Sequence, residues 1–227
     1  MRIVSLVPSV TETMLAWGVE PIACTRFCEQ PDLLHVGGTK DPDVPGIVAL
    51  APDLVVVNDE ENRLEDADAL TAAGIAVHVV SIKTVDDVEP AMRDLARAVS
   101  ATRFTAEPIP AGDPPPQLTA FVPIWKRPWM TMSGDTYGSS VLARLGVGNV
   151  FGEEAERYPT TDLDAAAARH PDVVLAPSEP YPFKQRHVAE LERVAPVVLI
   201  DGQDLFWWGA RTPAALTRLA SALRAVP

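Results

Sequence analysis

The residues best able to bind a ligand stand directly after short apolar runs of the sequence. In the first half of the chain they are Ser9, Arg26, Phe27, Thr39, Lys40, Asn58, Glu60 and Glu61. In the second half they are Asp135, Tyr137, Glu179, Tyr181, Phe183, Trp207 and Trp208. Open parallel sheets bind ligands beyond the carboxyl ends of their strands, so these are the candidate ligand-binding residues. The second set mixes aromatic and acidic side chains, which suits a sizeable planar or metal-bearing ligand.

Some of these residues also have an ordinary structural explanation. Ser9 and Glu12 have the spacing of a capping box at the start of a helix, and we expect Glu12 to cap rather than to bind a ligand. The acidic run at residues 59–61 suits a helix N-terminus as well as a ligand site, and the sequence does not decide between them. Trp207 and Trp208 point to opposite faces if their segment is extended, so at most one joins the core easily. We expect Trp208, or failing that Trp207, to contact the ligand.

A metal site cannot be assigned from the sequence. Carboxylates suit hard cations, so if a metal or cationic group is bound, Glu60, Glu61 and Glu179 are the expected contributors. The four histidines are scattered, and none of them forms a cluster with metal-binding spacing. Cys24 and Cys28 have a C-x3-C spacing, which differs from the zinc knuckle, and we expect two free thiols.

The common catalytic motifs are absent from the chain. There is no Gly-x-Ser-x-Gly elbow, no Gly-x4-Gly-Lys phosphate loop and no His-Glu-x-x-His, and Gly37-Gly38 lacks the third glycine of a dinucleotide fingerprint. We therefore expect no catalytic residue and no required cofactor.

The elements that must position the candidate residues alternate between strands and helices. In the first half we predict strands at residues 3–7, 21–24, 54–57 and 75–80, and helices at 9–17, 44–50 and 63–73. The uninterrupted apolar run at 54–57 is typical of a strand buried on both faces of a parallel sheet. The first half is therefore an α/β lobe.

The second half repeats this outline after a long helix and a connection. Helical spacing extends over residues 84–101, with Pro90 as a kink or an effective start, and five prolines then fall within residues 102–117. We predict a strand at 129–132 and a helix at 139–145 that stops at Gly146, as the first helix stops at Gly18. The Pro-Asp pair before the strand at 54–57 recurs before an apolar strand at 173–175.

Composition and charge exclude several function classes. The chain has 227 residues, of which 47% are hydrophobic, and its formal net charge is −12. Residues 1–101 carry 17 acidic and 7 basic side chains, so nucleic-acid binding is not expected. No apolar run is long enough to span a membrane. No export signal is visible, and we expect a cytoplasmic protein as the sequence stands, or a periplasmic or extracellular one if a signal was trimmed.

Several segments together resemble the helical-backbone substrate-binding proteins of ABC transporters. They are RIVSLVPSVTE (residues 2–12), GGT (37–39), LAPDLVV (50–56), the long helix and PDVVL (171–175). This group captures vitamin B12, haem, iron-siderophores or bare metals. The resemblance covers nearly the whole chain, and it depends on the order and spacing of these segments rather than on any one of them.

The resemblance implies a fold and a function. The fold is α/β, with two Rossmann-like lobes (residues 1–83 and 118–227) that have parallel sheets and are bridged by one long α-helix and a Pro-rich connection (84–117), the class III periplasmic-binding-protein arrangement. The function is non-catalytic capture of a corrinoid, haem, ferric chelate or metal ion in the inter-lobe cleft, with an ABC permease as partner. B12-binding members have an aromatic residue where this chain has Asn58, a departure that speaks against cobalamin itself. Tyr181, Phe183, Trp207 and Trp208 could supply an aromatic platform from the other lobe, so a corrinoid stays among the expected ligands. We expect a monomer.

Two other function classes remain open from the sequence. Residues 209–211 lack the carboxylate that transport members present to a permease, so the same scaffold could serve a cytosolic enzyme or a metallochaperone. A sensory or interaction domain is the third alternative.

Overall fold

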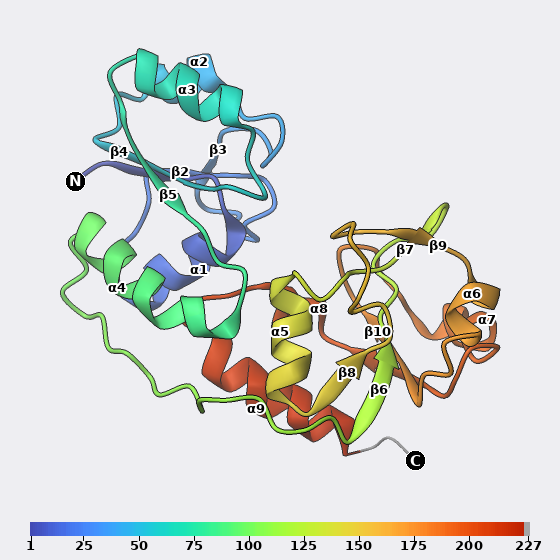
Figure 1. Cartoon of the computed structure of the whole chain (residues 1–227). Helices are drawn as coiled ribbons and strands as arrows, with labels where there is room; N and C mark the ends of the chain where they lie inside the picture. The colour runs from blue at the N-terminus through green and yellow to red at the C-terminus, as the bar shows by residue number, and fades with distance from the viewer. Residues whose placement is uncertain (225–227) are drawn as a thin grey trace. The chain divides into compact units, whose positions relative to one another are not determined.

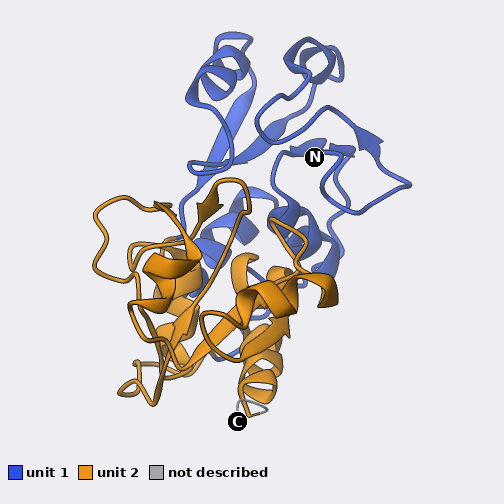
Figure 2. Ribbon diagram, turned by 90° about the vertical axis from the view of Figure 1, so that its right-hand side faces the viewer, with its two compact units in different colours: residues 1–82, 87–108, 208–210 blue, residues 83–86, 109–207, 211–227 orange. Residues whose placement is uncertain are grey.

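The computed structural model of the protein describes residues 1–224, and these form two compact units (Figure 2). Unit 1 comprises residues 1–82, 87–108 and 208–210, and unit 2 comprises the rest of the described chain. Both units have the alternating α/β organisation that the sequence predicts.

Unit 1 is built on a five-stranded parallel sheet with the order β3-β2-β1-β4-β5. Its strands are β1 (Ile3–Ser5), β2 (Ala23–Cys24), β3 (Leu34–His35), β4 (Leu54–Asn58) and β5 (Ala76–Val80). Every residue of the central strands β1 and β4 is buried, as the uninterrupted apolar run of β4 predicts.

Helices cover both faces of this sheet (Figure 1). They are α1 (Pro8–Ala16), α2 (Val44–Ala49), α3 (Leu64–Ala72) and α4 (Val88–Ala98). Helices α2 and α3 lie on one face, where Ile47 and Leu70 pack with Val4 and Val55 in one core cluster. Helices α1 and α4 lie on the other face. The unit is therefore a three-layer α/β/α structure.

Unit 2 is built on a four-stranded parallel sheet with the order β11-β10-β6-β8. Its strands are β6 (Leu118–Phe121), β8 (Val147–Asn149), β10 (Val173–Pro177) and β11 (Val197–Ile200). The strand predicted at 129–132 is only β7 (Trp129–Met130), which pairs antiparallel with β9 (Thr160–Thr161) outside this sheet. The predicted strand is therefore confirmed only for residues 129–130, and the first strand of the main sheet is β6, which was not predicted.

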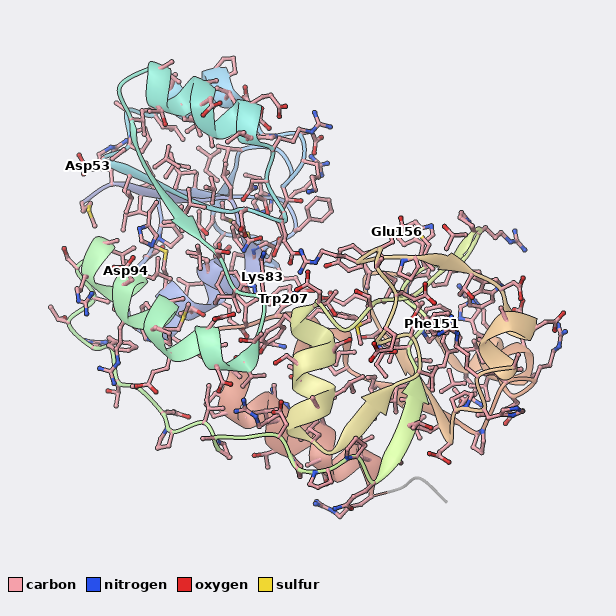
Figure 3. All side chains as sticks on the ribbon, viewed as in Figure 1. Asp53, Lys83, Asp94, Phe151, Glu156 and Trp207 are labelled. Atoms are coloured by element: carbon pink, nitrogen blue, oxygen red, sulfur yellow. The ribbon has the colours of Figure 1, made fainter. Side chains whose placement is uncertain are left out.

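The helices of unit 2 are short apart from the last one. They are α5 (Tyr137–Arg144), α6 (Leu163–Ala167), η2 (Gln185–His187), α7 (Val188–Leu191), α8 (Gly202–Phe206) and α9 (Thr212–Leu223), where η denotes a 3-10 turn. One core cluster joins Phe121, Phe151 and Val174 of the sheet region to Leu163 and Leu191 of α6 and α7 (Phe151 is labelled in Figure 3).

The repeated Pro-Asp pair has the same structural role in both sheets. Asp53 Oδ2 accepts the backbone N–H of Arg2 at 2.6 Å, and the Asp53 N–H donates to the Arg2 carbonyl at 2.8 Å (Figure 3 labels Asp53). Asp172 Oδ2 accepts the N–H of Thr119 at 2.6 Å, and the Asp172 N–H donates to the Thr119 carbonyl at 2.9 Å. Each aspartate therefore fixes the start of one central strand against its neighbour, β4 against β1 and β10 against β6.

The helix predicted at residues 84–101 is shorter than expected. A 3-10 turn, η1 (Val85–Asp87), precedes α4, which begins at Val88. Pro90 lies in the first turn of α4, where a missing N–H breaks no helical hydrogen bond. Pro90 thus marks the effective start of the helix, one of the two predicted outcomes. Residues 102–117 contain no helix or strand, as predicted for the Pro-rich connection.

Both predicted glycine terminators are confirmed. Gly18 follows α1 with a φ of +74°, and Gly146 follows α5 with a φ of +72°. A side chain is strained in this left-handed conformation, which explains glycine at both helix ends.

Candidate functional site

The predicted residues of unit 1 lie on loops that are tied to each other. Asn62, which follows β4, donates from its side-chain amide to the carbonyl oxygens of Leu6 (3.2 Å) and Thr39 (2.9 Å). Lys40 Nζ donates to the carbonyl of Glu60 at 2.5 Å. The loops after β1, β3 and β4 therefore form one edge at the carboxyl ends of the strands, the place where open parallel sheets bind ligands.

Ser9 does not cap helix α1, and its prediction as part of a capping box with Glu12 was wrong. Pro8 occupies the first turn and Val7 is the N-cap residue, without a side-chain hydrogen bond. Ser9 is only 2% exposed, and its hydroxyl has no hydrogen-bond partner. A buried hydroxyl without a partner is costly, and it lies here beside helical N–H groups that lack partners within the helix. This is a place where an acceptor group of a ligand would be stabilised.

Arg26 and Phe27 form a stacked pair on the turn after β2. The Arg26 guanidinium carbon lies 4.9 Å from the centre of the Phe27 ring. Arg26 Nη2 also donates to both carboxylate oxygens of Asp41, at 2.9 and 3.0 Å. Its charge is therefore neutralised locally, while the Phe27 ring is 50% exposed. The pair presents an apolar face rather than a free cation.

Asn58 organises the acidic run instead of standing exposed at the strand end. It is buried, and its amide donates to the Val80 carbonyl at 2.9 Å. Its Oδ1 accepts the backbone N–H groups of Glu60 (2.9 Å) and Glu61 (3.0 Å). Helix α3 begins only at Leu64, so the acidic run is a turn held by Asn58 and not a helix N-terminus. Glu60 and Glu61 are partly exposed on that turn.

Aromatic side chains gather at the carboxyl edge of the sheet in unit 2. Tyr181 follows β10, and Trp125 follows β6. The Tyr181 ring centre lies 5.7 Å from that of Trp125, in an edge-to-face arrangement, and 4.8 Å from that of Phe183. Phe183 is buried and stacks on Trp129 at 6.0 Å. Trp125 is 44% exposed and Tyr181 is partly exposed, so these two rings form the accessible part of the cluster. We call Trp125 and Tyr181 the aromatic surface.

Trp207 and Trp208 differ in burial, as expected for neighbouring residues that point to opposite faces of an extended segment. Trp208 is 4% exposed and belongs to the core, whereas Trp207 is partly exposed (Figure 3 labels Trp207). The Arg211 guanidinium carbon lies 5.1 Å from the centre of the Trp207 ring. Arg211 is held there by Gln203 (3.1 Å) and by the buried Asp204 (3.3 Å). The expectation that Trp208 comes first was wrong, and Trp207 is the tryptophan available to a ligand.

The polar candidates of unit 2 differ in exposure. Tyr137 is buried, its hydroxyl bonds that of Thr212 at 3.1 Å, and burial raises the pKa of Tyr137 to about 12. It is a neutral phenol at physiological pH. Asp135 is exposed and lies 3.4 Å from Arg157. Glu179 is partly exposed after β10, and its backbone passes so close to Gly202 that a Cβ there would lie 2.5 Å from the Glu179 nitrogen.

Two features of the site escaped the sequence analysis. Trp125 was missed because the strand before it, β6, was not predicted; its aromatic type was the available signal. The Ser133 hydroxyl is buried without a hydrogen-bond partner, like that of Ser9. Ser133 stands four residues before α5. Its backbone N–H donates to the Arg157 carbonyl at 2.8 Å, and its carbonyl accepts the hydroxyls of Thr136 and Ser139. The sequence places Ser133 in the polar turn after the predicted strand at 129–132, but no pattern in it indicates an unpartnered hydroxyl.

The described residues contain neither a metal-binding cluster nor a membrane-spanning helix. Within residues 1–224, no three His, Cys, Asp or Glu side chains are grouped closely enough to hold a metal ion. Over the same residues, no helix has both the length and the apolar character to cross a bilayer.

Comparisons with known proteins were made by sequence and by structure. No family model matches the chain. The vitamin B12-binding protein of Pectobacterium carotovorum subsp. carotovorum (strain PC1) is 24% identical over 202 residues, which cover 79% of this chain and 72% of that protein. The periplasmic vitamin B12-binding protein BtuF of Vibrio cholerae has a TM-score of 0.78 at 18% identity, covering 99% of this chain and 97% of that one. A periplasmic heme-binding protein from Pseudomonas aeruginosa has a TM-score of 0.79 at 19% identity, covering 100% and 94%.

These similarities confirm the resemblance inferred from the sequence and the predicted fold class. The chain has the α/β fold of the class III periplasmic binding proteins. The compared proteins are named for binding a ligand and not for catalysis. The two compared structures are of periplasmic proteins, so the cytoplasmic location expected from the sequence finds no support among them.

Proposed function

Starting from a fold shared with class III periplasmic binding proteins and from curated relatives that bind vitamin B12, we propose that this protein captures a corrinoid without transforming it. The observation that carries the proposal is the aromatic surface of unit 2. At the carboxyl edge of the sheet Trp125 is 44% exposed and Tyr181 is partly exposed, and the buried Phe183 lies against Tyr181. An aromatic surface of this kind suits a wide, largely planar macrocycle.

Two buried side chains of unit 2, Tyr137 and His187, are unsuited to ligate haem iron. Haem proteins supply an axial iron ligand, often His or Tyr. Tyr137 is buried and stays protonated because its pKa is raised to about 12. His187 is buried, its Nδ1 lies 3.0 Å from the Lys184 nitrogen, and its Nε2 lies 3.3 Å from Arg186 Nε. Neither side chain offers a free atom to iron, whereas a corrinoid brings its own axial ligands.

The proposal extends to location and partner. A corrinoid-capturing protein of this fold serves uptake, so we place it in the periplasm or outside the cell, with an ABC permease as its partner. The first turn of α3 carries Glu65, an exposed carboxylate of the kind that transport members present to a permease.

A thermal-shift panel tests the ligand class. The purified protein is heated alone and with cyanocobalamin, haemin, a ferric hydroxamate chelate or divalent metal salts. A ligand that binds only the folded state stabilises it by about 2.7 kcal/mol at one hundred times its Kd, so cyanocobalamin should raise the melting temperature clearly. A rise with haemin or the ferric chelate alone would show that the ligand class is wrong. No rise with any compound would contradict ligand capture itself.

A further inference from the structure

A group of basic side chains lies beside the aromatic surface of unit 2. Residues 125–129 and 181–187 are the two segments that bring Trp125 and Tyr181 together, and they contain no acidic residue. Their lysines and arginines are Lys126, Arg127, Lys184 and Arg186. The chain as a whole has a net charge of −12, so these segments differ in sign from the rest of the molecule. A local excess of positive charge attracts anions.

Most of this positive charge is not paired with a carboxylate. Lys126 forms an ion pair with Glu190. Arg127, Lys184 and Arg186 are exposed, and in the described part of the chain no carboxylate pairs with any of them. Three positive charges are therefore available to an anionic ligand.

His187 adds a buried hydrogen-bond donor next to Arg186. The imidazole ring is 6% exposed and packs against Tyr181, with the two ring centres 5.6 Å apart. Burial, and then the positive charges of Arg186 and Lys126, lower the pKa of His187, so its ring is neutral at physiological pH. A neutral imidazole has one N–H group, and its other nitrogen accepts a hydrogen bond.

Both ring nitrogens of His187 face hydrogen-bond donors, although only one of the two can accept. The backbone N–H of Lys184 donates to Nδ1 at 3.0 Å, so the ring proton is on Nε2. This Nε2 lies 3.3 Å from Nε of Arg186, which is a donor as well. Among the described residues no acceptor lies at the ring proton, and a buried donor without an acceptor is costly. An anionic oxygen placed here would accept hydrogen bonds from both side chains.

We propose that His187 and Arg186, assisted by Lys184, bind an anionic oxygen group of a ligand that lies on the aromatic surface. The identity of that ligand rests on the proposed function. The side chains of a corrin macrocycle end in neutral amides, and the anionic group of a cobalamin is the phosphodiester of its nucleotide arm. The phosphodiester therefore occupies this site, while the macrocycle lies on Trp125 and Tyr181.

Two corrinoids distinguish the anion site from the aromatic surface. Cyanocobalamin contains the phosphodiester, whereas dicyanocobinamide has the macrocycle without it. In calorimetric titrations Arg186→Gln should weaken cyanocobalamin binding about tenfold, the effect of losing a hydrogen bond to a charged group, and leave dicyanocobinamide binding unchanged. Added salt should weaken cyanocobalamin binding less in this variant than in wild type. Equal effects of Arg186→Gln on both corrinoids, or no effect on either, would overturn the assignment.

Two further variants control for charge and for packing. Arg193 is an exposed arginine of unit 2 that pairs with Asp164 at 3.1 Å, and Arg193→Gln should bind both corrinoids like wild type. An effect as large as that of Arg186→Gln would mean that overall charge matters and not a site. His187→Phe keeps a ring against Tyr181 but removes the donor, so it should weaken cyanocobalamin binding alone. Equal weakening of both corrinoids would mean that the His187 ring only supports Tyr181.

Inorganic phosphate tests the anion site without a corrinoid. Phosphate added at constant ionic strength should shift the nitrogen resonance of His187 Nε2 more than that of Nδ1, and Arg186→Gln should abolish the shift. This result in a protein that binds no corrinoid would support the anion site and contradict the proposed function. Phosphate binding as tight as that of cyanocobalamin would assign the site to a free anion. No shift in wild type would overturn the anion site, while saturable cyanocobalamin binding would still support the proposed function.

Discussion

Trp207 and Trp208 are neighbours in the chain, but their substitution should have different effects. Trp208 is 4% exposed, so Trp208→Ala should cost about 3–5 kcal/mol of unfolding free energy, as for other buried aromatic truncations. Trp207→Ala should leave stability nearly unchanged and weaken corrinoid binding by about 1–3 kcal/mol, the value of one aromatic contact. Urea unfolding and a binding titration measure the two effects. Normal corrinoid binding by Trp207→Ala would restrict the aromatic contacts to the surface formed by Trp125 and Tyr181.

Replacing Ser9, whose hydroxyl has no hydrogen-bond partner, should change stability and ligand affinity in opposite directions. Ser9→Ala removes a buried polar group that makes no hydrogen bond in the free protein, so the unfolding free energy should stay equal or rise by up to about 1–3 kcal/mol. If the hydroxyl bonds the ligand, affinity should fall by about 0.5–1.5 kcal/mol. Calorimetric titration and urea unfolding of the same variant test both effects.

A matched substitution shows what an ordinary structural hydroxyl contributes. Thr136 caps α5 by accepting the Ser139 N–H at 3.3 Å, so Thr136→Ala should lower stability by about 1 kcal/mol. If Ser9→Ala behaved like Thr136→Ala, the Ser9 hydroxyl would be a structural group and not a ligand contact.

At the scale of elements, the hydrogen bonds by which Asp172 holds the start of β10 against β6 should make the free energy of unfolding depend on pH. The N–H of Thr119 (2.6 Å) and its hydroxyl (2.9 Å) donate to Asp172, and these hydrogen bonds lower the pKa of Asp172. The folded state is therefore stabilised above the ordinary aspartate pKa of about 3.9, and this contribution is lost as pH falls through the lowered folded value. Urea midpoints measured from neutral pH to below the ordinary aspartate pKa of about 3.9 should fall less steeply for Asp172→Asn than for wild type. If the urea midpoints of the two proteins fell in parallel with pH, the ionised Asp172 carboxylate would not stabilise the contact between β10 and β6.

The elements that the sequence predicted are those with an unambiguous local signal. Strands β4 and β10 follow a Pro-Asp pair and are continuous apolar runs, so their burial could be predicted. Strand β6 has four residues, includes the polar Thr119 and follows a Pro-rich stretch, so no local pattern indicated it. Because β6 was not predicted, Trp125 was not recognised as a candidate, since candidate residues were taken only from the ends of predicted strands.

Local signals also misled where two of them compete. The Ser-x-x-Glu spacing at residues 9–12 fits a capping box only if Ser9 precedes the helix. Pro8 is itself suited to the first helical turn, so the helix includes it and Ser9 lies inside that turn. The unpartnered hydroxyl that results depends on packing around Ser9, which no sequence pattern reports.

At the scale of the whole molecule, we expect little change in the arrangement of the units on ligand binding. The chain passes between them repeatedly, at residues 82–83, 86–87, 108–109, 207–208 and 210–211. In unit 2, Arg144 pairs with Asp86 and Asp113, each at 2.8 Å, so the segments next to two of these passages are anchored. A hinge closure would require several backbone segments to change together. Small-angle scattering profiles with and without cyanocobalamin should agree; a reproducible contraction of the radius of gyration would refute this expectation.

The most direct test of corrinoid capture is a calorimetric titration of the full-length protein with cyanocobalamin. We predict saturable binding of one corrinoid per chain. Trp125→Ala should weaken that binding by about 1–3 kcal/mol. Val79→Ala, which truncates a side chain that is 54% exposed on β5, serves as the control and should bind like wild type. Absence of saturable binding by the wild-type protein, or equal affinity of Trp125→Ala and wild type, would contradict corrinoid capture on the aromatic surface.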